Sequence, residues 1–380
     1  MQIYLVGGAV RDRLLNLEVE ERDWVVVGAT IEEMVATGYR QLDAVFPVFA
    51  HPKSDEQYAL ARRERKTAPG HKGFSVHTSA DVTLAEDLER RDLTINAMAQ
   101  DADGTIVDPF SGRADLTAGI LRHVSPAFAE DPLRVLRVAR FRARLAHLGF
   151  TVTAETREIM QSMANAGELE SLSRERFWKE CDRALREPSP DAFFQELLDC
   201  QALERLVPDL ARALGASDGR DADDRPLVAL VRAAALSPEP LIRYATLCAA
   251  ASLQIAGENS TDRLLDALCA PASYRELTDT TIAGFAVFQS AAQADAHELL
   301  AGLEKLDAFR KPDRFQRFLV ACQAIAGAAE PVLQSRLAKA YEAASAVHAA
   351  DIADVSVGEG KKVGEALRML RRKAIAQMPD

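Results

Sequence analysis

Two acidic residues, Glu21 and Asp23, stand two positions apart directly before the β-branched segment that runs from Trp24 to Val27. Because successive side chains of a strand alternate between its faces, this spacing predicts that both carboxylates lie on one face. Such a pair can hold Mg²⁺, which prefers oxygen ligands and suits reactions of triphosphates. Solvated charge at the start of a strand would explain the same two residues, so the interpretation depends on their neighbours.

A glycine turn precedes the acidic pair. Gly7 and Gly8 follow the apolar segment from Gln2 to Val6, and Arg11 comes at the start of a segment with a helical pattern. A turn that opens a helix presents backbone N–H groups, and with a nearby guanidinium it could dock a triphosphate. Two adjacent glycines are often only a tight turn, but the turn and the acidic pair together favour phosphoryl transfer.

A third cluster contains Arg91, Asp92 and Asn96, within the run Arg-Arg-Asp-Leu-Thr-Ile-Asn-Ala. Its cationic, acidic and amide side chains are suited to binding a ribose and its phosphates. Local ion pairs at the start of a helix would explain the same residues.

Arginines occupy one face of a helix predicted to begin after Pro132. At 100° per residue, Arg134, Arg137, Arg140 and Arg144 fall within about 120° of one another, and the apolar residues take the other side. The helix therefore presents a face of positive charge.

Asp131 and Arg134 stand three positions apart, which is the spacing of a surface ion pair on a helix. A second interpretation uses the pairing edges of cytosine and adenine, which both offer an exocyclic amino donor beside a ring-nitrogen acceptor. A carboxylate beside a guanidinium complements that edge and mismatches uracil and guanine. A site of this kind rejects the wrong base strongly, because its polar groups would be left unpaired.

These motifs require a sheet with helices at the N-terminus and helices after it. From Pro132 onward the apolar pattern is helical to the end of the chain, with helix starts at Ser173 and Pro190. The Gly-, Pro-, Ser- and His-containing stretch Thr67–Ser79 is predicted to be a mobile loop. Short strands are predicted at Gln2–Val6, Trp24–Val27, Val45–Ala50, Tyr58–Arg62 and Thr105–Val107, and a helix at Ala9–Leu17.

The composition is that of an ordinary globular protein of two or three packed units, with 380 residues of which 48% are hydrophobic and 27% charged. Its apolar runs are far shorter than the roughly 20 residues that a membrane span needs. Five cysteines without a Cys-x-x-Cys pair indicate neither a disulfide framework nor a zinc cluster. No signal peptide is recognised, so we expect a cytoplasmic protein with no membrane partner. The net charge of −11 argues against general adhesion to nucleic acids, although a local basic surface can still steer a polyanion.

The motifs, in this order and spacing, closely resemble the second class of tRNA nucleotidyltransferases, the CCA-adding enzymes, and particularly their bacterial multifunctional form. The resemblance is specific over residues 1 to about 210 and thins beyond that. It implies an α+β protein with a polymerase-β-like nucleotidyltransferase head, a small mixed sheet with helices, followed by an all-α neck, body and tail. We place the head at 1–138, the neck at 139–212, and the body and tail at 213–380.

The resemblance also implies roles for single residues, at the positions that match the family's motifs. Gly8 and Arg11 would contact the triphosphate, and Glu21 and Asp23 would bind the Mg²⁺. Asp131 and Arg134 would contact the base. The residues that would contact the rest of the nucleotide are Arg91, Asp92, Asn96, Arg137 and Arg140. The segment from Ser173 to Glu180 resembles the family's helix that supports the neck.

Two residues depart from the family pattern. The family usually has aspartate where this chain has Glu21, and often a carboxylate where it has Gln57. Glutamate still binds a cation, whereas an amide cannot act as an anionic ligand. If a third carboxylate is needed, Asp55 is the candidate, because the alternation of side chains along a strand places Asp55 on the same side as Gln57.

The multifunctional form also carries a histidine-aspartate phosphohydrolase site. The corresponding segment here has Ala249 and Ala250 where that pair would stand, and Arg225 near an expected metal-binding histidine. We expect that no phosphohydrolase activity remains, and hydrolysis of cyclic phosphodiesters by the purified protein would contradict this.

The resemblance therefore predicts template-independent, Mg²⁺-dependent addition of C, C and A to tRNA from CTP and ATP, with the tRNA acceptor arm as partner. The alternatives are addition of only CC, only A or poly(A), or a catalytically weakened paralogue that binds tRNA. The chain would act as a monomer or homodimer.

Overall fold

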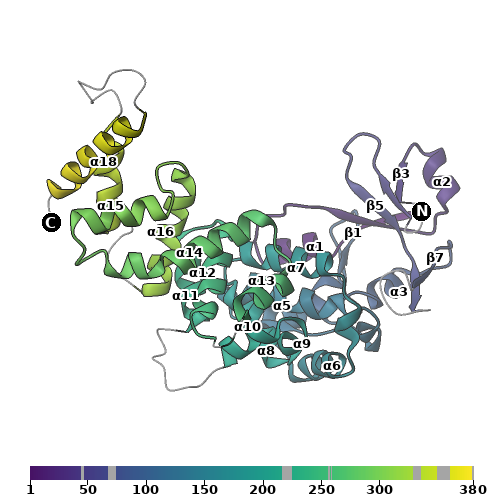
Figure 1. Cartoon of the computed structure of the whole chain (residues 1–380). Helices are drawn as coiled ribbons and strands as arrows, with labels where there is room; N and C mark the ends of the chain where they lie inside the picture. The colour runs from purple at the N-terminus through teal and green to yellow at the C-terminus, as the bar shows by residue number, and fades with distance from the viewer. Residues whose placement is uncertain are drawn as a thin grey trace. The chain divides into compact units, whose positions relative to one another are not determined.

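The computed structural model, drawn in Figure 1, describes residues 1–43, 47–66, 74–215, 225–255, 257, 259–327, 335–348 and 360–378. The chain divides into two compact units, Met1–Leu206 (unit 1) and Val207–Asp380 (unit 2). The predicted boundary between head and neck, after residue 138, falls inside helix α5 (Leu133–Leu145), which packs against helices α7 and α8 of the same unit. Unit 1 therefore continues through that position.

A seven-stranded mixed sheet lies in unit 1, in agreement with the predicted fold class. Its strand order is β3–β4–β5–β2–β1–β8–β9. Neighbouring strands run antiparallel except β2 and β5, which run parallel. The strands span Gln2–Val6 (β1), Asp23–Val27 (β2), Arg40–Asp43 (β3), Val48–Ala50 (β4), Gln57–Leu60 (β5), Ala99–Gln100 (β8) and Ile106–Val107 (β9).

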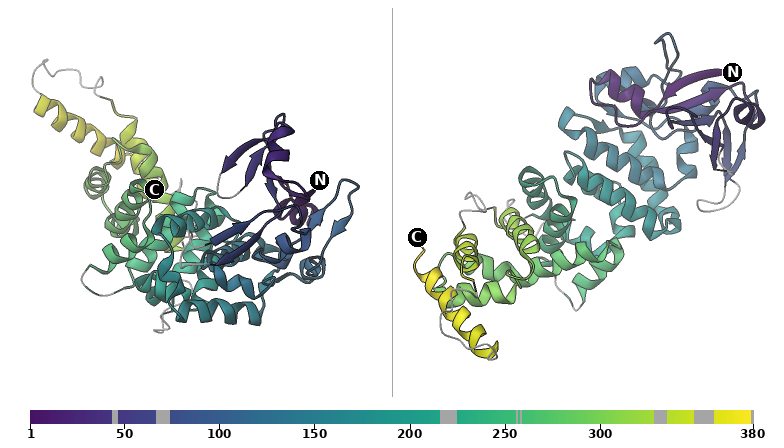
Figure 2. Two further views of the ribbon diagram at one scale, coloured as in Figure 1. Left: turned by 90° about the vertical axis from the view of Figure 1, so that its right-hand side faces the viewer. Right: turned by 90° about the horizontal axis from the view of Figure 1, so that it is seen from above.

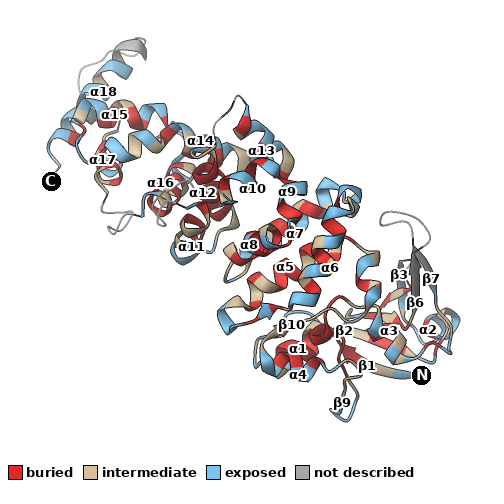
Figure 3. Cartoon of the chain, turned by 90° about the horizontal axis from the view of Figure 1, so that it is seen from below, coloured by how far each residue is buried: buried red, intermediate tan, exposed pale blue. Residues whose placement is uncertain are grey.

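Both faces of this sheet are covered in its middle. Val25 packs with Val6 and Leu88 on one face, whereas Val26 packs with Met34 and Phe49 on the other. Each of these valines is no more than 2% exposed, which explains the continuous apolar run of β2. Figure 3 shows the buried positions along β1 and β2. Polar side chains of the central strands can therefore reach solvent only at the strand ends.

Four further strands lie outside the large sheet. They form the antiparallel pair β6 (Arg63–Lys66) and β7 (Phe74–His77) and the parallel pair β10 (Ile120–Leu121) and β11 (Thr151–Val152). The predicted loop Thr67–Ser79 is thus wrong for its β7 portion, because β6 offers that segment a pairing partner. Residues 67–73 lie outside the described residues, as do residues 44–46 of the predicted strand Val45–Ala50.

Several helices of unit 1 begin at a residue whose side chain forms an N-cap. Ser173 accepts a hydrogen bond from the Arg176 amide and caps α7, as predicted. Thr30 and Thr83 form capping boxes at α2 and α3. The helices span Gly8–Leu14 (α1), Ile31–Ala36 (α2), Leu84–Glu89 (α3), Gly112–Ala118 (α4), Leu133–Leu145 (α5), Ala154–Asn165 (α6), Arg174–Arg186 (α7), Asp191–Asp199 (α8) and Ala202–Leu206 (α9).

Unit 2 is helical throughout its described residues, as Figure 2 shows in green to yellow. Its core gathers apolar residues of α12, α14, α15, α16 and α17, among them Leu277, Leu303 and Phe318. The helices span Pro208–Gly215 (α10), Pro226–Leu236 (α11), Pro240–Ser252 (α12), Ser260–Leu268 (α13), Ala272–Ser290 (α14), Ala296–Lys305 (α15), Pro312–Ala326 (α16), Arg336–Ser345 (α17) and Gly360–Ala376 (α18). Across the described ranges of both units, no helix is both long and apolar enough to span a membrane.

Helix α12 carries the segment that resembles a phosphohydrolase motif. Ala249 and Ala250 are at most 2% exposed, and Cys248 and Tyr244 are equally buried beside them. The positions where the resemblance expects metal ligands are therefore filled by apolar packing. Within the ranges that the structure describes, no group of three or more His, Cys, Asp or Glu residues could hold a metal ion.

Candidate active site

Asp23 lies at the exposed end of the central strand β2. The ladder joins it to Val6, the last residue of β1, and to Gln57, the first residue of β5. Glu21 lies before the strand, so the prediction that both acidic residues share a strand is wrong. The physical reason is that β1 ends at Val6 and the chain turns away at Gly7, so the ladder stops at Asp23.

The glycine turn lies directly beside this strand end. Gly7 has a φ of +69°, and a Cβ there would come within 2.8 Å of Nη1 of Arg91, so both the backbone and the close approach require glycine. Arg91 donates hydrogen bonds to the carbonyl oxygen of Asn96 and to the carboxylate of Asp87, each at 3.4 Å. These contacts hold the Arg91 guanidinium against the turn and toward Asp23.

Asp23 shares one electrostatic environment with three other charged groups. Partial burial raises the pKa of the Asp23 carboxyl, Arg91 and Arg137 oppose that rise, and Glu21 adds to it. Asp23 is therefore within electrostatic reach of one further carboxylate and two guanidiniums, and it is open to solvent. Such an arrangement can attract a cation to its acidic side and phosphates to its basic side.

Gln57 is the residue next to Asp23 on the neighbouring parallel strand. Asp55, expected to share the side of Gln57, lies in the turn before β5 with a φ of +58°, so strand alternation does not apply to it. Its side chain is 80% exposed and pairs with Arg40 at 3.1 Å. Glu56 likewise lies 3.7 Å from a surface arginine. Asp55 is thus engaged at the surface, Glu56 approaches Arg22, which stands between Glu21 and Asp23, and an amide occupies the position beside Asp23.

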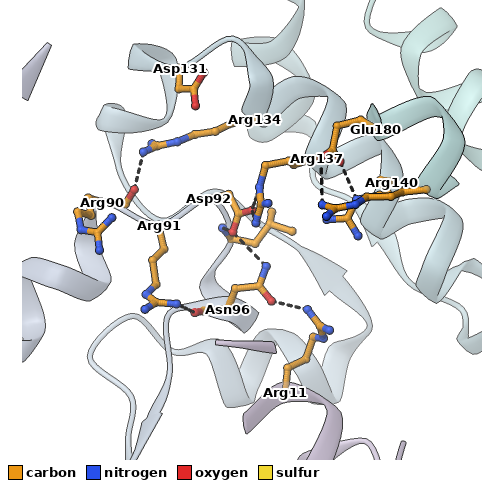
Figure 4. Close-up of polar contacts among 12 residues, drawn as sticks. Arg11, Arg90, Arg91, Asp92, Asn96, Asp131, Arg134, Arg137, Arg140 and Glu180 are labelled. Carbon is orange, nitrogen blue, oxygen red and sulfur yellow. Dashed lines mark hydrogen bonds and ion pairs between the residues drawn. The ribbon is translucent and has the colours of Figure 1, made fainter. Parts of the chain in front are cut away.

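Behind the strand ends, a buried polar network links the glycine turn to helix α5 (Figure 4). Arg11 donates to Oδ1 of Asn96 at 2.6 Å, and Asn96 donates through Nδ2 to Asp92 at 3.0 Å. Arg137 donates to the other oxygen of Asp92 at 2.7 Å. Arg11, Asp92 and Asn96 are each at most 5% exposed. They lie inside the protein, and their direct contact with a nucleotide stays a prediction.

Asp92 is the central acceptor of this network. Burial alone would raise the pKa of its carboxyl, but Arg137, Asn96 and the amide of Leu93 outweigh burial and lower the pKa. A carboxylate that is buried, paired and hydrogen-bonded in this way stabilises the charged form. Asp92 therefore fixes the direction of the Arg137 side chain.

Asp92→Asn should destabilise unit 1 by about 2 kcal/mol at neutral pH, because it removes the buried charge that accepts from Arg137, whose side chain is 34% exposed, and from Asn96. The lowered pKa gives the sign of the pH dependence. Asp92 contributes stability above its unfolded pKa of about 3.9, and this contribution is lost as pH falls toward the folded pKa. The gap between parent and variant should therefore narrow in acid.

Urea titration followed by tryptophan fluorescence measures this effect, because Trp24 and Trp178 both lie in unit 1 and are the two tryptophans of the chain. The matched control is Asp103→Asn, which changes an exposed aspartate. Equal unfolding midpoints for the two variants would contradict a stabilising role for Asp92.

Asp131 and Arg134 lie at the start of helix α5 with different partners. Arg134 is 8% exposed and donates to the carbonyl oxygens of Ala127 and Arg90. Asp131 accepts a hydrogen bond from the Leu133 amide at 3.0 Å, and its other oxygen lies 3.5 Å from Arg176 of helix α7. Backbone carbonyls therefore orient the guanidinium, as Figure 4 shows for the Arg134 contact with Arg90.

Three buried carboxylates that support the arginines were not singled out from the sequence. Glu180 of α7 accepts from Arg140 at 2.7 Å, and Asp12 binds both Arg11 and Arg144. Asp87 is fully buried and pairs with Arg90 and Arg91. Of these three, only Asp87 could have been predicted from the sequence, because it stands three and four positions before its two arginines, which is the spacing of ion pairs on a helix.

Comparison with known proteins shows that two segments between residues 3 and 214 match known families. Residues 3–122 match the poly A polymerase head domain. Residues 149–214 match the model described as the probable RNA and SrmB-binding site of polymerase A. The first match covers the sheet and the acidic strand end.

Relatives of known name match the chain over its full length. The chain is 47% identical to the multifunctional CCA protein of Thioalkalivibrio sulfidiphilus, covering 100% of this chain and 98% of that protein. It is 48% identical to a CCA-adding enzyme of Pseudomonas putida, covering 99% and 98%. The crystal structure of the Bacillus stearothermophilus CCA-adding enzyme in complex with CTP has the same fold, with a TM-score of 0.62, 24% identity and coverage of 98% of this chain and 88% of that one.

Proposed function

The chain belongs to the family of the CCA-adding enzymes, and on that premise we propose that it adds C, C and A to the 3′ end of tRNA from CTP and ATP, without a nucleic-acid template. One observation carries the proposal. The exposed carboxylate of Asp23 stands at a strand end beside the glycine turn, within electrostatic reach of Glu21, Arg91 and Arg137. This is the arrangement that nucleotidyl transfer needs, because the reaction is promoted by positioning and charge neutralisation.

The donor set fits Mg²⁺. Asp23 and Glu21 offer hard carboxylate oxygens, and Mg²⁺ is commonly held by one or two carboxylates together with phosphates of the substrate. When bound, the ion would neutralise phosphate charge and favour ionisation of an attacking hydroxyl. Burial is the main cause of the raised pKa of the Asp23 carboxyl, and the charge of Glu21 adds to it.

The protein residues have separate tasks in the proposed reaction. Asp23 orients the terminal 3′-hydroxyl of tRNA. The hydroxyl releases its proton to water, its oxygen bonds to the α-phosphorus of CTP or ATP, and the bond to pyrophosphate breaks. Arg91, Arg137 and Arg140 hold the triphosphate, and Gly8 allows the chain to approach it closely. Asp131 and Arg134 pair with the amino group and the ring nitrogen of cytosine or adenine.

Gln57→Glu should tighten the binding of a divalent ion about tenfold. The change adds a negative charge on the strand beside Asp23. Such a charge contributes on the order of 1 to 2 kcal/mol to the binding of a nearby cation at a protein surface. Electron paramagnetic resonance of Mn²⁺ measures free and bound ion without any turnover. Gln41→Glu, an exposed position on strand β3, is the control, and equal Mn²⁺ affinities in both variants would exclude Gln57 from the ion's surroundings.

The function is tested with tRNA that lacks its CCA end, given CTP alone, ATP alone or both, followed by sizing of the products. We expect extension by two nucleotides with CTP and by three with both. Extension with only one nucleotide type indicates a CC-adding or A-adding enzyme, and long products with ATP indicate a poly(A) polymerase. Tight binding of the acceptor arm without incorporation would replace the proposal with a tRNA-binding paralogue weakened at Glu21 and Gln57.

We place this activity in the cytoplasm, where the thiols of the five free cysteines stay reduced.

A further inference from the structure

Three guanidiniums from two helices converge on a single aromatic ring. The Cζ atom of Arg140 lies 4.7 Å from the centre of the Phe141 ring, that of Arg11 lies 4.9 Å away, and that of Arg137 lies 5.7 Å away. Arg11 comes from α1, whereas the other two come from α5. The ring is 5% exposed, and the side chains of Arg11 and Arg140 are largely buried, whereas that of Arg137 is 34% exposed.

Each of the three guanidiniums also has a carboxylate partner of its own. Arg11 makes two bonds to Asp12, at 2.8 and 2.9 Å. Arg137 pairs with Asp92 and Arg140 pairs with Glu180, each at 2.7 Å. The carboxylates therefore bind nitrogen edges of the arginines, and the ring supplies a common contact for all three.

The ring solves an electrostatic problem at this position. Like charges held close together repel each other. Burial lowers the pKa of the Arg11 guanidinium, its pairing with Asp12 opposes this, and the nearby Arg144 lowers the pKa further. The face of an aromatic ring carries partial negative charge and attracts cations within about 6 Å of its centre. An aliphatic side chain of similar size would fill the space without that attraction.

We propose that Phe141 is a positioning residue for nucleotide binding, which holds Arg11, Arg137 and Arg140 together through the charge distribution of its ring. The inference rests on the proposed function, in which Arg137 and Arg140 hold the triphosphate. Phe141 itself does not touch the substrate. It acts by keeping the guanidiniums at their present spacing, so its loss weakens CTP binding before it affects the chemical step.

The test replaces Phe141 with mono-, di- and trifluorinated phenylalanine, which keep the shape of the ring and withdraw charge from its face in steps. CTP affinity is measured by calorimetry, and KM and kcat are measured in single-nucleotide addition to tRNA. We expect affinity to fall stepwise to about a tenfold loss for the trifluorinated ring, with KM rising and kcat nearly unchanged. A role in packing alone would not respond in this way, since the fluorinated rings fill the same space.

The matched control is Phe193, a buried ring of α8 whose ring contact is with Phe194 at 5.1 Å. The same fluorinated series at Phe193 should leave CTP affinity unchanged. Normal incorporation by the parent together with a flat series at Phe141 would overturn the positioning role and leave the proposed function standing. Failure of the unmodified protein to bind CTP at all would overturn the proposed function, and the positioning role with it.

Discussion

Asp23→Asn should abolish nucleotide incorporation, with an expected loss on the order of 10³-fold in kcat/KM for CTP. The substitution keeps the size of the side chain and removes the charge at the open end of β2, which is within electrostatic reach of Arg91 and Glu21. A loss of this size corresponds to about 4 kcal/mol, which is the scale of stabilisation that a correctly held metal ion provides. Single-nucleotide addition under multiple-turnover conditions measures it.

Asp55→Asn is the control for this experiment. Asp55 stands beside the same sheet and carries the same charge, but its side chain is 80% exposed and pairs with Arg40. It should retain the activity of the parent. Tryptophan fluorescence from Trp24 and Trp178 checks that unit 1 stays folded in both variants. Normal incorporation by the folded Asp23 variant would refute the assignment of the catalytic strand end.

The central strands were predictable from sequence because their residue types match their surroundings. β2 is apolar on both faces because both faces of the sheet are covered. The uninterrupted apolar run from Trp24 to Val27 indicates a strand of this kind. The end of the strand was harder to predict. A strand extends only as far as its partners do, and β1 stops at Val6, so Glu21 falls outside the ladder. The alternation of side chains along one strand cannot indicate where the neighbouring strand ends.

The arginine-bearing helix shows the same limit for side chains. The helical period predicts that Arg134, Arg137 and Arg140 share a face, and helix α5 has that arrangement. The helical period does not indicate which side chains from distant segments of the chain contact this face. Glu180 lies 40 positions from its partner Arg140, and neither residue stands out in the sequence as one of a pair.

These partners change the interpretation of the motif residues. Asp92 and Asn96 have side chains suited to binding a ribose, yet their polar atoms are engaged with Arg137 and Arg11. A motif shows which residue types stand together, and the same types serve for contact with a ligand or for support of other side chains. Burial separates the two cases, and it depends on the whole fold. We therefore infer that part of the motif positions the arginines that meet the nucleotide.

Arg134→Ala should lower the preference for CTP over UTP by about 10- to 100-fold. In the proposed site Arg134 donates to the ring nitrogen of cytosine, and a good pair of hydrogen bonds to a base contributes about 1 to 3 kcal/mol of discrimination. The Arg134 guanidinium is held by the carbonyl oxygens of Ala127 and Arg90, so it presents a fixed edge to the base. The measurement is the ratio of kcat/KM for CTP and UTP with the same tRNA.

Arg134→Lys separates charge from geometry in this experiment. Lysine keeps the positive charge but lacks the planar fork that reaches both carbonyl oxygens, so discrimination should fall nearly as far as with alanine. Affinity for tRNA should change little in either variant, because in the proposed site Arg134 contacts the base of the incoming nucleotide and not the tRNA. Equal losses for CTP, UTP and tRNA binding would instead mean that Arg134 only supports the fold. Restored selectivity in the lysine variant would mean that its charge alone selects the base.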